Sequence, residues 1–146
     1  MAEVSENQLS ILETEVWTLI SKNPESYGLQ VQATAIKILQ SNFSLLQPNL
    51  QNELSALSQV AQSQSITEDA VALNRKLWQM IDDVYMHINE QKVATVRAAI
   101  CATPYLDPQD PQMTLEYLVV FSKAAGFTNE SIFQAIASSF SIANEV

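Results

Sequence analysis

Glycine and tight-turn signals are scarce in this 146-residue chain. It has only two glycines, Gly28 and Gly126, and no Asn-Gly or Asp-Gly pair. The hairpins of a β-sheet protein need such residues, because their tight turns require positive φ angles. The scarcity therefore disfavours an all-β fold and favours helices. It also excludes a Gly-rich phosphate loop and a Gly-x-Ser-x-Gly nucleophile elbow, since both need closely spaced glycines.

Basic residues are few as well, with 7 lysines and arginines against 16 aspartates and glutamates, which gives a formal net charge of −9. A field of this sign repels nucleic-acid phosphates and anionic lipid headgroups. No stretch approaches the roughly 20 apolar residues that span a bilayer. We therefore expect no nucleic-acid partner and no membrane partner.

Cysteine occurs once, as Cys101, so the chain cannot form an internal disulfide. Its first ten residues, MAEVSENQLS, lack the basic residues and the apolar run of a secretory signal. Lone thiols of this kind are typical of reducing compartments. These observations predict a cytoplasmic protein.

The first half of the chain has apolar residues at helical spacing and several helix-start signals. Ser5 and Gln8 are spaced as a capping box, in which each side chain satisfies an otherwise unpaired backbone N–H. Asn23 and Pro24 favour the start of a second helix, with a capping side chain before a proline. Gly28 weakens the first turns of that helix, so a later start is the alternative. The pattern predicts helices over residues 5–22, 24–41 and 48–63.

The second half shows similar start and stop signals. Pro104 ends one helical run, and Asp110 and Pro111 open the next. Gly126 stands where a left-handed residue would end that helix. The pattern predicts helices from about residue 67 to 88, over 91–103, over 110–125 and from 128 to about 140. The helix over 91–103 either continues the one before it or follows a bend.

The segment Leu115–Phe121 is apolar almost all round, which is typical of the most buried helix of a bundle. Its residues also have strand propensity, but the end signals and a length of about 15 residues favour helix. The sequence therefore predicts an all-α fold, a compact bundle of six or seven helices with the 110–125 helix central. We expect a single helical domain over 1–146, with helical halves 1–64 and 65–146 as the alternative subdivision.

Two reactive side chains occur once each, His87 and Cys101. Asp83 and Glu90 lie about one helical turn from His87, so a local metal site is one interpretation. The other is a surface histidine in a hydrogen-bonded cluster, because a helical di-iron site needs two Glu-x-x-His pairs. Cys101 lies among alanines, which is typical of a small core residue rather than a nucleophile. We therefore expect no catalytic residue, no metal and no cofactor.

Large aromatic side chains allow a different function. They could line a pocket for a small apolar ligand between helices, which would make the chain a carrier or sensor. The alternative is that they fill the core, the commoner use of aromatics at helical spacing. The residues concerned are Trp17, Trp78, Tyr85, Tyr117 and Phe121.

Two stretches carry almost no charge. Residues 41–65 contain one charged residue, Glu53, and the last helix bears serine and glutamine at its polar positions. Interface cores are depleted in charged residues, so both faces are candidates for contact with a partner. A general preference for Gln and Ser on surfaces is the alternative explanation. The candidate interaction surface comprises Gln51, Ser55, Ser58, Gln59, Gln62, Gln134, Ser138 and Ser141.

These observations predict a non-enzymatic protein-interaction module, such as a regulator, adaptor or assembly factor, that docks through uncharged helix faces. The expected partner is a protein, and a homo-oligomer is compatible with the same faces. Two alternatives remain open: a helical carrier or sensor of a small apolar ligand, and an acidic inhibitor of a basic enzyme or toxin. The inhibitor predicts association that weakens steeply with salt.

Overall fold

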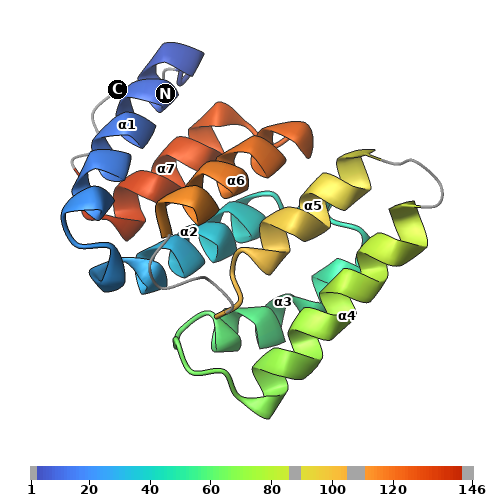
Figure 1. Cartoon of the computed structure of the whole chain (residues 1–146). Helices are drawn as coiled ribbons and strands as arrows, with labels where there is room; N and C mark the ends of the chain where they lie inside the picture. Colours follow the sequence, from blue (N-terminus) through green and yellow to red (C-terminus); the bar gives the residue numbers. More distant parts are fainter. Residues whose placement is uncertain (1–2, 86–89, 105–110, 143–146) are drawn as a thin grey trace.

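The computed structural model describes residues 3–85, 90–104 and 111–142. Over these residues the chain is all-helical and contains no strand, which confirms the predicted fold class. Seven α-helices pack against one another (Figure 1). They are α1 (Glu6–Lys22), α2 (Gly28–Ser41), α3 (Pro48–Val60), α4 (Glu68–Tyr85), α5 (Glu90–Ile100), α6 (Pro111–Ala124) and α7 (Asn129–Ser139), with short 3-10 turns at Pro24–Ser26 and Phe43–Leu45.

Side-chain caps start three of the helices where the sequence predicts them. Ser5 Oγ accepts a hydrogen bond from the Gln8 backbone N–H at 3.1 Å, and Gln8 Oε1 accepts one from the Ser5 N–H at 2.8 Å. This completes the capping box of α1. Thr67 Oγ1 caps α4 and Thr128 Oγ1 caps α7, with contacts of 3.2 and 3.1 Å to backbone N–H groups.

The second and third helices are shorter than predicted. Pro24–Ser26 forms only a 3-10 turn, and α2 starts at Gly28, because Asn23 makes no side-chain cap hydrogen bond. The third helix ends at Val60, earlier than the sequence predicts. The loop after α3 packs closely on the start of α2, where a Cβ added at Gly28 would lie 2.8 Å from Gln64 Oε1. Tertiary contacts thus override the local sequence signals at the start of α2 and at the end of α3.

Helices α6 and α7 both end with a left-handed residue. Gly126 has a φ angle of 88°, and the Phe127 N–H donates back to the Ser122 carbonyl oxygen at 3.0 Å. Ser141 has the same role after α7, with a φ angle of 55°, and the Ile142 N–H donates back into α7 at 2.8 Å. Both are Schellman-type ends, in which an apolar residue follows the left-handed one and packs on the core.

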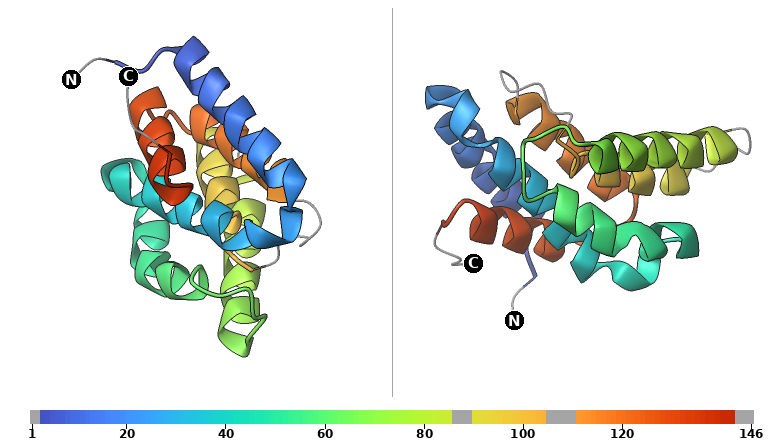
Figure 2. Two further views of the ribbon diagram at one scale, coloured as in Figure 1. Left: turned by 90° about the vertical axis from the view of Figure 1, so that its left-hand side faces the viewer. Right: turned by 90° about the horizontal axis from the view of Figure 1, so that it is seen from below.

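Helix α2 runs through the middle of the bundle and contacts α3, α5, α6 and α7. Helix α1 packs on α6 and α7 on one side, while α3 and α4 lie together on the other, as Figures 1 and 2 show. Helices from the two alternative halves, 1–64 and 65–146, therefore pack against one another. The buried apolar side chains form one continuous core to which all seven helices contribute.

Helix α6 takes the inner position that the sequence predicts, between α1 and α5 and against α2. Leu115 on its inner face is fully buried. The expectation that this helix is the most buried one is wrong, however. The side chains of Met113, Tyr117 and Val120 are 41, 50 and 54% exposed. Helix α2 buries more of its residues than α6 does.

Helices α4 and α5 pack side by side as a hairpin (Figure 1). Helix α5 is thus a separate helix packed against α4 and does not continue it. Ala94, Ala98 and Ala99 are buried, and their small side chains allow α5 to lie close to its neighbours α4 and α6.

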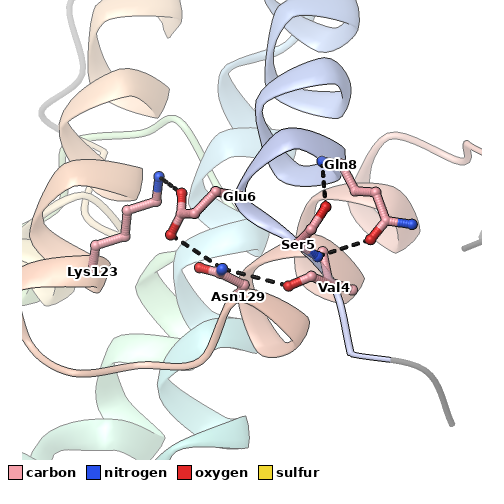
Figure 3. A network of polar contacts seen from close by, with 6 residues as sticks. All are labelled: Val4, Ser5, Glu6, Gln8, Lys123 and Asn129. Carbon is pink, nitrogen blue, oxygen red and sulfur yellow. Dashed lines mark hydrogen bonds and ion pairs between the residues drawn. The ribbon is translucent and has the colours of Figure 1, made fainter.

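A polar network joins the start of α1 to α6 and α7 (Figure 3). Glu6 Oε2 lies 2.9 Å from Lys123 Nζ, and Glu6 Oε1 accepts a hydrogen bond from Asn129 Nδ2 at 3.1 Å. Asn129 Nδ2 also lies 3.5 Å from the Val4 carbonyl oxygen. The hydrogen bonds from Lys123 and Asn129 stabilise the ionised carboxylate, so they lower the pKa of Glu6.

Replacing Lys123 with methionine is expected to raise the pKa of Glu6 toward its ordinary value of 4.5. Because the folded-state pKa lies below the unfolded value, the contact stabilises the fold at higher pH. This stabilisation is lost as pH falls through the lowered pKa. An NMR titration of the Glu6 carboxyl carbon in both proteins measures the shift. An unchanged pKa in the methionine variant would contradict the contact.

Candidate functional site

Four of the five candidate residues at α3 share one face of the helix, because they are spaced by three or four residues. They are Gln51, Ser55, Ser58 and Gln62, the last in the turn after the helix. Gln51 Nε2 donates a hydrogen bond to the Phe43 carbonyl oxygen at 2.9 Å and so holds the turn that precedes α3. Ser55 and Gln62 are exposed, and Ser58 is half-buried. Most of this stripe is therefore accessible to a partner.

Gln59, the fifth candidate at α3, faces α4 instead. It lines an open groove of about 410 Å³ between α3 and α4, which we call the α3–α4 groove. Lys76 Nζ and Glu53 Oε1 form an ion pair of 2.6 Å across it, and Asp69 also lines it. This groove is therefore charged, unlike the stripe on the other face of α3.

The three candidates at the C-terminal helix also lie at the surface. Ser138 and Ser141 are exposed, and Gln134 is half-buried. Ser138 Oγ accepts a hydrogen bond from Lys37 Nζ of α2 at 3.0 Å. Ser141 is the left-handed residue that ends α7. The hydrogen bond between Lys37 and Ser138 places these parts of the α2 and α7 surfaces next to each other.

A second open groove, of about 360 Å³, lies between α2 and α3; we call it the α2–α3 groove. Its lining includes Leu29, Ala33 and Ile36 from α2 and Ser58 and Gln62 at α3. Lys37 lines it too and is the same residue that binds Ser138. Lys37 therefore connects this groove to Ser138 of α7 through a single hydrogen bond. We call the groove, the stripe on α3 and Ser138 together the low-charge face.

A buried glutamine holds the end of α3 against α2. Gln32 is fully buried, and its Nε2 donates to the carbonyl oxygens of Ala61 and Ser63 at 2.9 and 3.1 Å. Its Oε1 accepts a hydrogen bond from Gln64 Nε2. These bonds fix α3 beside α2 and so shape the groove between them. Sequence reasoning missed Gln32, because glutamine is mostly exposed on helices and no local signal marks this one.

The five aromatic residues considered for a ligand pocket do not lie together. Trp78, Tyr117 and Phe121 meet at a hollow of about 150 Å³ among α4, α5 and α6. Trp17 lines a separate groove between α1 and α6, and the side chain of Tyr85 lies outside the described residues. Trp17 therefore does not share a pocket with Trp78, Tyr117 and Phe121, because α6 lies between α1 and α5.

The predicted histidine cluster falls on His87, which lies outside the described residues, as do the side chains of Asp83 and Glu90. Neither interpretation of His87, a metal site or a surface histidine in a hydrogen-bonded cluster, is therefore tested. Within the part of the chain that the structure describes, no three His, Cys, Asp or Glu residues form a group that could hold a metal ion.

Cys101 is buried just after the end of α5, and its Sγ lies 3.4 Å from the Arg97 carbonyl oxygen. Burial raises the pKa of the thiol to about 12, and the positive charge of Arg97 opposes this only in part. Very little thiolate exists at neutral pH, so this side chain is poorly suited to nucleophilic catalysis.

We expect Ellman's reagent to modify Cys101 in the folded protein more than about a hundredfold slower than in denaturant, because the raised pKa of the buried thiol leaves little thiolate. The released chromophore measures both rates, and the denatured protein is the control for full reactivity. A folded-state rate equal to that of the denatured protein would contradict the burial of this thiol.

Comparison of the chain with models of known protein families, with curated proteins and with solved structures gave no match. Over the described ranges, no helix has both the length and the apolar character needed to cross a membrane. The surface of the molecule is thus the source of evidence for its function.

Proposed function

We propose that this chain is a non-enzymatic protein-interaction module, such as a regulator, adaptor or assembly factor, that docks a partner protein onto the low-charge face. The α2–α3 groove is the observation that supports this most. It presents apolar side chains, including Leu29 at 43% exposure, beside hydroxyl and amide groups. Lys37 is the single charged residue in its lining. A cytoplasmic location belongs to the same proposal.

The charge of the two grooves favours docking at α2 and α3. Moving an ion out of water into an interface costs free energy unless it gains a partner there. The α3–α4 groove would require burial of Glu53, Asp69 and Lys76. The α2–α3 groove would require burial of Lys37 alone, and its ammonium already donates to Ser138. Burial of the apolar side chains that line the groove, chiefly the exposed Leu29, then contributes favourably to the free energy of binding.

The shape of the α2–α3 groove indicates what the partner contributes. An open groove between two helices suits the apolar side chains of a helix or an extended segment. The polar groups of Ser58 and Gln62 at its edge can make hydrogen bonds with that segment. We therefore expect a partner segment with an apolar stripe and little charge.

One observation and one expected result bear on the alternatives. The hollow that gathers three of the aromatic residues has about 150 Å³, less than the roughly 300–1,000 Å³ of sites for drug-sized ligands, so these aromatic residues do not favour the carrier. An acidic inhibitor would lose affinity steeply with salt, while docking on the low-charge face depends only weakly on it. A salt titration of the complex therefore distinguishes the inhibitor from the module.

A photo-crosslinking amino acid placed at Gln62 tests the proposal and identifies the partner in the cells that make this protein. The same group at Gln59, three positions away in the α3–α4 groove, is the control. We expect one protein to be crosslinked from position 62 and much less from position 59. Equal labelling from both positions, or none from position 62, would contradict docking at the α2–α3 groove.

A further inference from the structure

Arg97 of α5 is held at the surface by two aromatic rings. Its guanidinium carbon lies over the Trp78 ring at 5.2 Å from the ring centre and over the Phe121 ring at 4.7 Å. Tyr117 stacks on Phe121, with ring centres 6.1 Å apart. Because the rings come from α4 and α6, three helices together fix the position of the guanidinium.

This arginine has no anionic partner among the residues that the structure describes. Glu53 is paired with Lys76 and Glu6 with Lys123, and neither pair involves Arg97. The rings stabilise the positive charge of Arg97 but supply no oxygen acceptor for its N–H donors. A carboxylate is the acceptor that matches two of these donors at once.

The hollow beside Arg97 sets the size of the group that can reach it. Its volume is about 150 Å³. Thr103 and Thr114 also line it, while Trp78 and Tyr117 at its edge are 41 and 50% exposed. The hollow is thus open to solvent and has room for one side chain.

We propose that this hollow, the arginine–aromatic site, binds one aspartate or glutamate side chain of a partner protein. Tryptophan, tyrosine and arginine are the residues that contribute most often to binding hot spots. The net charge of −9 repels a polyanion, so a single carboxylate flanked by apolar residues fits better than an acidic run or a nucleic acid. Exposed Val120, one turn beyond Tyr117 on α6, can contact the flanking apolar residues.

The arginine–aromatic site is independent of the low-charge face. It is formed by α4, α5 and α6, whereas the low-charge face is formed by α2, α3 and α7. Each proposal can therefore fail without the other.

Selection of random peptides displayed on phage against the full chain tests this site. We expect the enriched peptides to share one Asp or Glu beside apolar residues. Changing that acid to its amide should weaken binding by about tenfold or more, and Arg97→Gln should weaken the original peptide equally. Combining both changes should cost little more, because they remove the same contact. Arg75→Gln, at an exposed position of α4, is the control and should bind like the wild type.

Several outcomes would overturn the proposal: no enriched peptide, enriched peptides without an acidic residue, or equal losses for the Arg75 and Arg97 variants. A dimer in sedimentation velocity that Arg97→Gln dissociates would also overturn it, since a second copy would then occupy the site. If Arg97→Gln lowers the melting temperature, the acid-to-amide peptides measured on the wild-type protein give the same answer without a protein variant.

Discussion

Replacing Gln32 with leucine is expected to lower the free energy of unfolding by about 2–4 kcal/mol. Leucine fits a similar space but cannot donate, so the carbonyl oxygens of Ala61 and Ser63 would lose their hydrogen bonds in a mostly buried site. Gln64 would lose its acceptor at the same time. Urea denaturation followed by circular dichroism measures the change.

Gln40→Leu is the matched control for this prediction. It makes the same substitution on the same helix, but at an exposed side chain. Its effect should stay within about 0.5 kcal/mol, as for most surface substitutions. Equal losses in the two variants, or none at Gln32, would show that the Gln32 hydrogen bonds do not hold α3 against α2.

Local signals predicted much of this fold. The Ser5–Gln8 capping box and the Thr128 cap act within one helical turn, so neighbouring residues determine them. Gly126 is recognisable for a similar reason, because a positive φ angle favours glycine. Ser141 adopts the same backbone conformation after α7 without any sequence signal, and tertiary packing of the following residue accounts for it.

The contacts that shape the candidate surfaces join residues far apart in the sequence, so local sequence patterns could not predict them. Gln32 and the carbonyl oxygens it binds are about thirty residues apart in the sequence. The cation–π contacts of Arg97 join helices that are adjacent only in the folded chain. Periodicity placed the candidate glutamines and serines on helix faces, but it could not show that Gln59 and Gln62 belong to different grooves.

Replacing Gln62 with lysine is expected to weaken partner binding by about tenfold or more. The new ammonium would join Lys37 in the α2–α3 groove, and docking would remove both charges from water. Gln62 is exposed and follows the C-terminal end of α3, where a positive charge is favourable, so the fold should keep its stability. Calorimetric titration with the purified partner, once crosslinking has identified it, measures the affinity. Thermal denaturation checks the fold.

The most direct test compares this variant with Gln59→Lys, which adds the same charge three residues away. Gln59 is exposed and lies in the α3–α4 groove, where Glu53 and Asp69 can accommodate a positive charge. If the partner docks on the low-charge face, the dissociation constant of the Gln62 variant should be at least about ten times that of the Gln59 variant. Equal dissociation constants for the two variants would contradict docking at the α2–α3 groove.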